Sequence, residues 1–384
     1  MAHILVTAIS FKSITTLTIR NPSHLPSGST PTVVTITGLP RFSLIMEKKI
    51  TVDVDPDLHL MTDEYNADDW TSETTSIGSS LYRGLMSNGR RYQSLKSDEY
   101  CFPADEKQFE TYDAAHLAAL LVDSEEDNLL FQSPIIPRNV LDIGTGKGSW
   151  AIDVADMFPN AQVRGVDLFP PPVSWVPPNC VLEVDDVLQE WTWRDKFDLI
   201  HLRIMASAFT PEEMEKLMAQ IYDHLEPGGW IEQMEIHPTI YCDDNSVAPD
   251  NVLFDIGPRC DAAANNSGKP MDLIRTMRST IEKAGFVDIH DKQVKWPIGP
   301  WPKDKTMKEL GSVNLHHWLT GMEGYTMYLM TKFGSPTPWR PEEVQVYNAR
   351  IRKELLNPRH HTYQRARRVW ARKPLVEPKI EQHD

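Results

Sequence analysis

The chain has 384 residues, of which 41% are hydrophobic and 24% are charged, and its formal net charge is −15. This composition is typical of a soluble globular protein with one large domain or two modest ones. The acidic balance argues against binding of nucleic acid over the whole surface, because phosphates require a positive field. Four cysteines without a C-x-x-C pair exclude a disulfide framework, predict no metal site and favour a reducing compartment. No apolar run reaches the roughly 18–20 residues that cross a membrane.

Residues 1–87 are predicted to be a disordered or targeting-like leader. The chain has no acidic residue before Glu47, and the preceding segment is rich in Ser and Thr with scattered basic residues. Mitochondrial targeting segments have such a composition. A disordered leader, or a gene start at Met46, explains it equally, and we favour these two explanations. We therefore expect a cytoplasmic protein, with a nuclear or a mitochondrial location as the alternatives.

From residue 105 onward the hydrophobic pattern predicts alternating helices and strands. Helices are predicted at 105–122, 150–158, 210–225 and 273–284, and strands at 139–143, 162–166, 180–184, 197–202, 230–236, 286–294 and 363–370. Strands that alternate with helices in this way are typical of a mostly parallel, doubly wound α/β sheet.

The helix predicted at 210–225 has the clearest boundaries. Thr210 can act as its N-cap, Pro211 suits the first helical position, and Glu213 stands where a capping box needs it. The sequence Pro227-Gly228-Gly229 is expected to end it.

Residues 297–360 are punctuated by prolines and rich in aromatic residues and methionine. We interpret them as a helical cap over the acceptor site, inserted between a core at 88–296 and a final strand and tail at 361–384. Packing within the helices is the commoner role of such side chains, but six of them could line an acceptor pocket: Trp301, His316, His317, Trp318, Tyr325 and Tyr328.

A basic cluster follows the cap. Contact with nucleic acid or a membrane is one explanation, but no groove-reading motif surrounds the cluster and the chain is acidic overall, which favours a solvated strand and tail. The cluster consists of Arg365, Arg367, Arg368, Arg372 and Lys373.

A predicted buried strand runs into a glycine turn in the sequence VLDIGTGKG at 140–148. Glycines let the backbone turn sharply and approach a ligand, and the following helix offers free N–H groups to an anionic group. Ser149 occupies the position of the third glycine of the dinucleotide fingerprint, and the P-loop pattern is absent. The turn therefore indicates a nucleotide-like ligand of another kind.

Acidic residues follow the next two predicted strands. Asp167 comes 19 residues after Gly148, where a carboxylate can accept hydrogen bonds from both hydroxyls of a ribose. Asp185 and Asp186 follow the third strand, where an acid can reach an adenine amino group. Because the carboxyl ends of parallel strands meet at one edge of a sheet, these residues predict a single ligand site.

Four residues near that edge are candidates for a general base, if an acceptor must lose a proton. They are His201, Glu235, His237 and Tyr241. His201 is more readily explained as a structural histidine, and Glu235 and His237 could be edge residues of a strand. The sequence alone therefore assigns no catalytic residue.

Longer stretches of the chain resemble the fungal LaeA-like methyltransferases, a class I family that uses S-adenosylmethionine. The resemblance covers about residues 88–373 and is carried by the runs LDIGTGKGSWAIDVADMFPNAQVRGVDLFP, FDLIHLR, EPGGWIEQMEIH and RKELLNPRHHTY. It implies a Rossmann-like, seven-stranded sheet, with S-adenosylmethionine as the cofactor. Lys147 departs from the family pattern, since a small residue is usual there.

The resemblance also implies roles for individual residues. The methionine-binding turn corresponds to Asp142, Gly144, Thr145 and Gly146; the ribose position to Asp167 with Leu168; the adenine side to Asp185, Asp186 and Val187; the D-x-I-H-x-R signature to His201; and the segment over the cofactor to Tyr92.

The expected function is S-adenosylmethionine-dependent N- or O-methylation of a small-molecule secondary metabolite or a modified peptide. Two alternatives stay open. One is a LaeA-like nuclear regulator of secondary metabolism and development that acts in a protein complex. The other is a protein that binds the cofactor without turnover. We expect a small-molecule acceptor, a possible protein partner, no direct contact with nucleic acid and no membrane.

Overall fold

The computed structural model describes residues 81, 83–96, 100–124, 126 and 128–375, so most of the predicted leader lies outside the described residues. The strands are β1 (Leu85–Ser87), β2 (Arg90–Tyr92), β3 (Asn139–Ile143), β4 (Gln162–Asp167), β5 (Cys180–Val184), β6 (Phe197–Arg203), β7 (Leu225–Ile236), β8 (Tyr241–Cys242), β9 (Val287–Ile298) and β10 (Thr362–Arg372). The helices are α2 (Glu106–Val122), α3 (Ser149–Met157), α4 (Pro211–His224), α5 (Ile256–Asn266), α6 (Leu273–Lys283), α7 (Lys305–Phe333) and α8 (Pro341–Leu355), with a 3-10 turn η1 at Val252–Phe254.

The main sheet has eight strands in the order β5-β4-β3-β6-β7-β10-β8, and β9 also pairs with β10. The five strands from β5 to β7 are parallel, whereas β10 runs antiparallel to both β7 and β9. The predicted α/β, Rossmann-like class I fold is confirmed. Seven of the strands were predicted, and the eighth is the two-residue β8.

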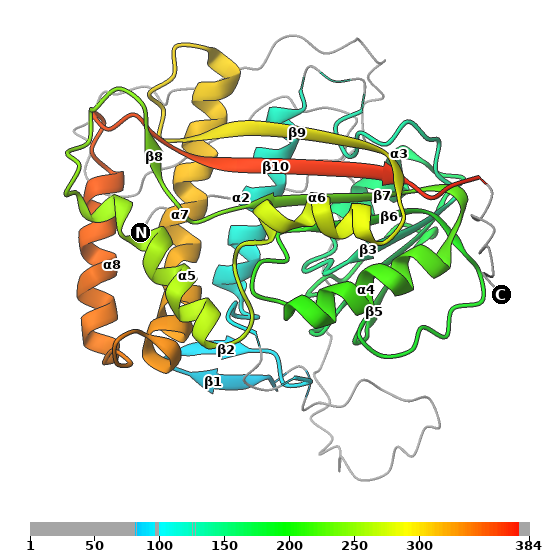
Figure 1. Cartoon of the computed structure of the whole chain (residues 1–384), viewed down its shortest axis with the longest axis horizontal. Coiled ribbons are helices and arrows are strands. Elements are labelled where there is room, and N and C mark those ends of the chain that lie inside the picture. The colour runs from blue at the N-terminus through cyan, green and yellow to red at the C-terminus, as the bar shows by residue number, and fades with distance from the viewer. Residues whose placement is uncertain (1–80, 82, 97–99, 125, 127, 376–384) are drawn as a thin grey trace, which may run out of the picture. The chain divides into compact units, whose positions relative to one another are not determined.

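Helices cover both faces of the sheet (Figure 1). On one face, α4 and α6 pack through Leu217, Ile221 and Met277 against the apolar side chains of β6 and β7. On the other face, α3 packs through Trp150 and Val154 against β3 and β4. The glycine turn at the start of α3 is thereby fixed at the carboxyl edge of the parallel strands. Among the described residues, no helix is long and apolar enough to cross a membrane.

Helix α4 begins and ends within one residue of the predicted bounds, but the residues that follow it differ from the prediction. Thr210 accepts a hydrogen bond from the Glu213 amide at 3.1 Å, and the Glu213 carboxylate accepts one from the Thr210 amide at 2.9 Å. The predicted terminator Pro227-Gly228-Gly229 instead lies inside β7. Buried Lys373 donates to the carbonyl groups of Tyr222 and Leu225 at 2.7 and 3.0 Å, so it satisfies carbonyls that the end of the helix leaves unpaired.

Helices α5, α7 and α8 form a separate helical region beside one end of the sheet (Figure 1). Helices α7 and α8 fall within the segment predicted as a cap, whereas η1 and α5 were not predicted. The last three residues of the predicted leader, Leu85–Ser87, form β1 of a short hairpin with β2.

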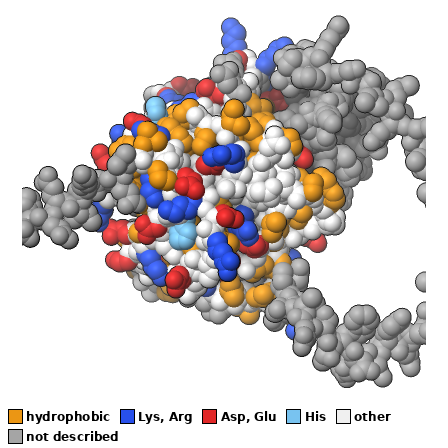
Figure 2. Space-filling model, turned by 90° about the vertical axis from the view of Figure 1, so that its right-hand side faces the viewer, with side chains coloured by type: hydrophobic (Ala, Val, Ile, Leu, Met, Phe, Trp, Pro, Cys, Tyr) orange, Lys and Arg blue, Asp and Glu red, His pale blue; other side chains and the backbone are white. Residues whose placement is uncertain are grey.

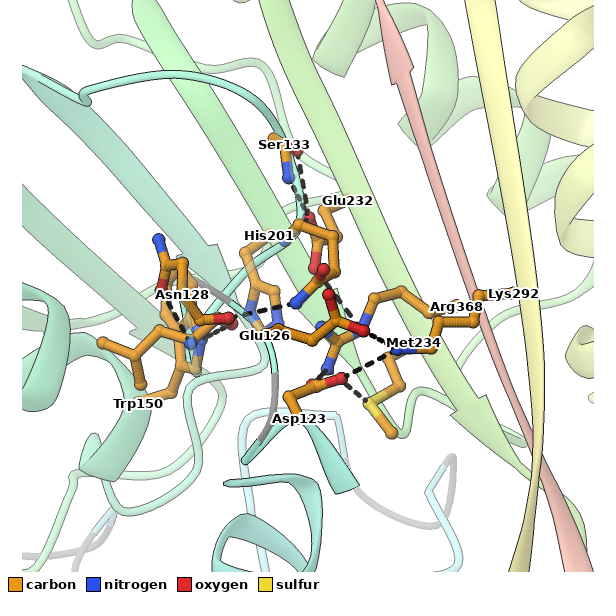
Figure 3. Close-up of polar contacts among 12 residues, drawn as sticks. Asp123, Glu126, Asn128, Ser133, Trp150, His201, Glu232, Met234, Lys292 and Arg368 are labelled. Carbon is orange, nitrogen blue, oxygen red and sulfur yellow. Dashed lines mark hydrogen bonds and ion pairs between the residues drawn. The ribbon is translucent and has the colours of Figure 1, made fainter. Parts of the chain in front are cut away.

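A cluster of buried charges joins α2 to three strands (Figure 3). Arg368 on β10 lies 2.5 Å from Asp123 and 3.5 Å from Glu232, and Lys292 on β9 lies 3.5 Å from Asp123. Glu232 also accepts hydrogen bonds from the amide and hydroxyl groups of Ser133, both at 3.0 Å. Because unpaired buried charges are costly, these partners fix the end of α2 against the sheet.

The sequence suggested that the basic cluster at the end of the chain lies on a solvated strand and tail, but most of its side chains have partners within the protein. Arg368 and Lys373 are buried, and Arg367 and Arg372 form ion pairs with aspartates of β9. The face drawn in Figure 2 also mixes acidic and basic side chains over its described part. The partners of Arg368 and Lys373 lie on α2, β7 and the end of α4, and those of Arg367 and Arg372 lie on β9, so these four side chains join elements that are distant in the sequence. Arg365 is exposed.

Candidate functional site

A cavity lies at the carboxyl ends of β3, β4 and β6. Its lining includes ten of the eleven residues that the sequence analysis assigned to the cofactor: Asp142, Gly144, Thr145, Gly146, Asp167, Leu168, Asp185, Asp186, Val187 and His201. These residues come from four separate segments of the chain, and the sheet brings them to one edge. We call this space the first cavity.

The glycine turn of the first cavity has a backbone that only glycine adopts easily. Gly144, Gly146 and Gly148 have φ angles of +69°, +58° and +88°, where a Cβ atom is strained. A Cβ at Gly144 would also overlap the sulfur of Met205. The amides of Gly144 and Thr145 both donate to the Val166 carbonyl, at 2.9 and 3.0 Å, which ties the turn to β4.

Asp142 is held by two side chains at the base of this turn. Its carboxylate accepts a hydrogen bond from the Thr145 hydroxyl at 2.7 Å and lies 2.8 Å from His201 Nδ1. The His201 ring is stacked on Trp150, with centroids 3.8 Å apart. Burial lowers the pKa of His201 to about 4, so the ring is neutral and donates its Nδ1–H to Asp142. His201 therefore orients Asp142.

Lys147, the departure from the family pattern, does not point freely to solvent. Its ammonium group lies 2.5 Å from the Asp113 carboxylate on α2. This partner offsets the unfavourable position of a lysine near the start of α3.

Asp167 stands at the end of β4 with its carboxylate already oriented. It accepts hydrogen bonds from the amides of Gly146 at 2.8 Å and Phe169 at 3.3 Å. Burial raises its pKa to about 6, so it is mostly ionised at neutral pH. An oriented, partly desolvated carboxylate is suited to accept hydrogen bonds from a vicinal diol.

The acids after β5 differ in exposure. Asp185 is exposed and Asp186 is half-buried. Asp186 forms an ion pair with Lys96 at 3.0 Å, and its pKa is lowered by the surrounding hydrogen bonds, although burial opposes this effect. Asp186 and Lys96 thus close one end of the first cavity.

The structure contradicts the placement of Tyr92 at the cofactor. Its hydroxyl donates to the Gly324 carbonyl at 3.3 Å and its ring packs on Tyr328, because β2 directs it into the core of the helical region. Tyr100 and Tyr112 line the first cavity instead. The local sequence contains several tyrosines, and no local pattern distinguishes the one that reaches the cavity.

Arg203 is a lining residue that the sequence analysis did not assign. It ends β6, and its guanidinium donates to His116 Nδ1 at 3.0 Å, while His116 Nε2 lies 2.8 Å from Asp153. Three basic side chains line the first cavity: Lys96, Arg203 and Lys269. Lys96 and Lys269 pair with Asp186 and Glu213, whereas no carboxylate among the described residues lies within ion-pair distance of Arg203. The sequence signal that could have identified Arg203 is its position two residues after His201 in the sequence His-Leu-Arg.

Of the remaining base candidates, only His237 reaches a cavity. Glu235 is fully buried and accepts hydrogen bonds from the Met205 amide at 3.1 and 3.2 Å; burial raises its pKa to about 7. It holds the loop after β6 and lines neither cavity described here. Tyr241 stacks on Tyr363 and also lies outside both linings.

A second cavity adjoins the first, and Phe102, Tyr112 and Ile204 line both. Ile204 has a φ of +56°, which is rare for a β-branched residue and places strain between the cavities. The described residues that line the second cavity include no Asp, Glu, Lys or Arg. Besides the three shared residues, its lining contains Gln108, Thr111, Ile236, His237, Met271, His317, Trp318, Met322, Tyr325 and Gln364. Three of the six cap side chains considered above, His317, Trp318 and Tyr325, therefore line a cavity.

Both ring nitrogens of His237 are engaged. Nδ1 accepts a hydrogen bond from the Thr239 amide at 3.2 Å, and Nε2 lies 3.0 Å from the Asp261 carboxylate. These contacts leave no ring nitrogen for a substrate proton. The described residues also contain no group of three or more His, Cys, Asp or Glu that could hold a metal ion.

Comparisons with known proteins agree with this geometry. A family model described as a methyltransferase domain matches residues 105–290. Methyltransferase pytC of Aspergillus terreus is 36% identical over 75% of this chain and 87% of its own length. The secondary metabolism regulator LAE1 of Cochliobolus heterostrophus is 32% identical over 75% and 94% of the two chains. The probable methyltransferase tdiE of Emericella nidulans is 28% identical over 64% and 74%.

The chain belongs to the LaeA-like family of class I, S-adenosylmethionine-dependent methyltransferases. The resemblance recognised in the sequence is thereby confirmed. In this methyltransferase the strand, glycine turn and acidic residues of the family motifs all contribute to the first cavity.

Proposed function

We propose that this methyltransferase transfers the methyl group of S-adenosylmethionine to an oxygen or nitrogen atom of a small molecule, either a secondary metabolite or a modified peptide. The observation that carries the proposal is the pair of adjoining cavities with a shared wall. One is lined by charged and backbone hydrogen-bonding groups, and the other by uncharged side chains. Methyl transfer needs a donor and an acceptor aligned in a space that excludes water.

The residues of the first cavity fit the chemical groups of the donor. The Gly144–Gly146 turn leaves room for close backbone approach, and the carboxylate oxygens of Asp142 would accept a hydrogen bond from the ammonium group of the methionine part. Arg203 would pair with its carboxylate. Asp167 would accept hydrogen bonds from the ribose hydroxyls, and Asp186 with Val187 would lie at the adenine. When bound, the donor supplies an activated methyl group.

A regulatory function is the second candidate, because LAE1 is named a secondary metabolism regulator. Such a protein would act with a protein partner in the nucleus. The uncharged, largely apolar and aromatic lining of the second cavity favours a small acceptor over a protein side chain. A cytoplasmic location remains a prediction, and binding of the cofactor without turnover is the third candidate.

Calorimetric titration with S-adenosylmethionine and S-adenosylhomocysteine tests the proposal first. We expect micromolar binding that Asp167→Ala weakens by about 10- to 100-fold, since a charged hydrogen bond contributes about 1.5–3 kcal/mol. Asp195→Ala, at an exposed position outside both linings, is the control. Absence of binding to the folded parent protein would contradict the proposal, and binding without methyl transfer to any acceptor would favour the third candidate.

A further inference from the structure

Several polar side chains of the second cavity form hydrogen bonds within the protein. Gln364 accepts a hydrogen bond from Trp318 Nε1 at 2.6 Å and donates to Asn314 at 3.3 Å. The Thr111 hydroxyl donates to the Lys107 carbonyl at 2.9 Å, and both nitrogens of His237 are engaged. Most polar side chains of this wall are therefore satisfied within the protein.

Gln108 is an exception. It lies on α2 and is 1% exposed, and its side chain contacts the Tyr112 hydroxyl, yet its Oε1 atom has no hydrogen-bond partner among the described residues. A buried acceptor without a donor costs free energy unless a ligand or a water supplies one. Gln108 therefore indicates that the natural occupant of the second cavity brings a hydrogen-bond donor.

His317 on α7 is the second exception. Its Nδ1–H donates to the Thr111 carbonyl at 3.2 Å, which leaves Nε2 with a lone pair and no hydrogen bond to another described residue. Burial lowers the pKa of His317 to about 4, so the ring is neutral at physiological pH and its tautomer is fixed by the Thr111 carbonyl. The side chain thus presents an acceptor, and not a charge, to the cavity that it lines.

We propose that the second cavity binds a neutral aromatic acceptor that carries a hydroxyl group, and that His317 Nε2 accepts the proton of this hydroxyl during methyl transfer. This inference rests on the proposed function. The uncharged, aromatic wall disfavours a charged ligand because no counter-ion would replace the lost water, and both unmet groups, Gln108 Oε1 and His317 Nε2, require donors.

The reaction balances without a further reagent. The hydroxyl oxygen forms a bond to the methyl carbon as the carbon–sulfur bond breaks, and the sulfur keeps the electron pair. The hydroxyl proton moves to His317 Nε2 and then to solvent. The products are a methyl ether, a neutral thioether and one proton.

Binding to the complex with S-adenosylhomocysteine tests the acceptor chemistry. The probes are 2-naphthol, its methyl ether 2-methoxynaphthalene, which has no donor, and 6-hydroxy-2-naphthoate, which adds a charge. We expect 2-naphthol to bind at least about tenfold more tightly than either of the others, which is about 1.4 kcal/mol. In His317→Phe, the ratio of the affinity for 2-naphthol to the affinity for its methyl ether should fall to about one. His316→Phe is the matched control, because His316 pairs with Glu110 and does not line the cavity.

Turnover with labelled S-adenosylmethionine separates binding from proton transfer. His317→Gln retains a hydrogen-bond acceptor but not a base, so we expect its KM for 2-naphthol to stay within about threefold while kcat falls about 100-fold or more. An unchanged kcat, or equal binding of naphthol and its ether to the parent complex, would overturn the inference. Failure of the parent protein to bind S-adenosylhomocysteine would instead overturn the proposed function.

Discussion

The two adjoining cavities differ in how their polar groups are satisfied. In the first cavity, Asp142 and Asp167 already accept hydrogen bonds from the protein, which orient their carboxylate oxygens for a ligand. In the second, the described lining carries no Asp, Glu, Lys or Arg, and Gln108 Oε1 and His317 Nε2 accept no hydrogen bond from another described residue. A charged methyl donor bound in the first cavity and a neutral acceptor bound in the second would require this difference between the two linings. The comparison predicts that changes in the first cavity weaken cofactor binding, whereas changes in the second alter acceptor binding alone.

The largest effect is expected from Gly144→Ala. The substitution places a Cβ in the left-handed region and against the Met205 sulfur, so the turn must move. We expect affinity for S-adenosylhomocysteine to fall by about 100-fold or more, and unfolding to require about 1–3 kcal/mol less free energy.

Gly89→Ala is the control for this substitution. Gly89 has a comparable φ of +75° but no atom within 4 Å of an added Cβ, and it lies outside both linings. Its variant should lose some stability but bind the cofactor normally. If both variants bind normally, the glycine turn is not the ligand site.

The next effect concerns Arg203. If Arg203 holds the carboxylate of the cofactor, Arg203→Met should weaken S-adenosylhomocysteine binding by about tenfold or more. It should leave binding of methylthioadenosine, which has no carboxylate, almost unchanged. Arg278→Met, on α6 and paired with Asp291, is the control. Equal loss for both ligands would show that Arg203 shapes the cavity and does not recognise the carboxylate.

The sequence predicted best what depends on local chemistry. The capping box of α4 and the glycine turn were visible because their partners are close in the chain, and Asp167 was visible because it ends a strand. Arg203 and His116 are 87 residues apart, and His317 and Thr111 are 206 apart. Only the packing of α2 against α7 and the sheet brings such pairs together.

The missed and misplaced elements have physical reasons as well. Helix α5 has the sequence IGPRCDAAANN, in which glycine, proline and small residues obscure the helical period. The end of α4 was predicted to within one residue, but its cap was not, because Lys373, almost 150 residues later, binds its carbonyl groups. The buried part of the basic cluster, Arg368 and Lys373, could not be recognised because its partners on α2, β7 and the end of α4 are more than 100 residues away.

A smaller effect is expected from pH. Because burial raises the pKa of Asp167 to about 6, this carboxylate gains a proton as the pH falls through 6 and then accepts hydrogen bonds less well. Affinity for S-adenosylhomocysteine, measured by calorimetry from pH 7.5 to 5, should fall by up to about tenfold. Asp167→Asn should bind weakly with little dependence on pH in this range. A parallel pH dependence in both proteins would assign the titration to another group.

The smallest effect, and the sharpest contrast with the first cavity, is expected from Gln108→Met. The substitution removes a buried acceptor that has no donor among the described residues, and this offsets the loss of the amide contact with Tyr112. The free energy of unfolding in urea should therefore stay within about 1 kcal/mol of the parent value. Gln364→Met is the matched control, because Gln364 pairs with Trp318 Nε1 and Asn314 Oδ1. Its loss leaves these two buried atoms without their partner, which should cost about 1–3 kcal/mol. If Gln108→Met destabilises the protein as much as Gln364→Met, then Gln108 Oε1 has a hydrogen-bond donor within the free protein. His317 Nε2 would then be the remaining group of the second cavity that indicates a ligand with a donor.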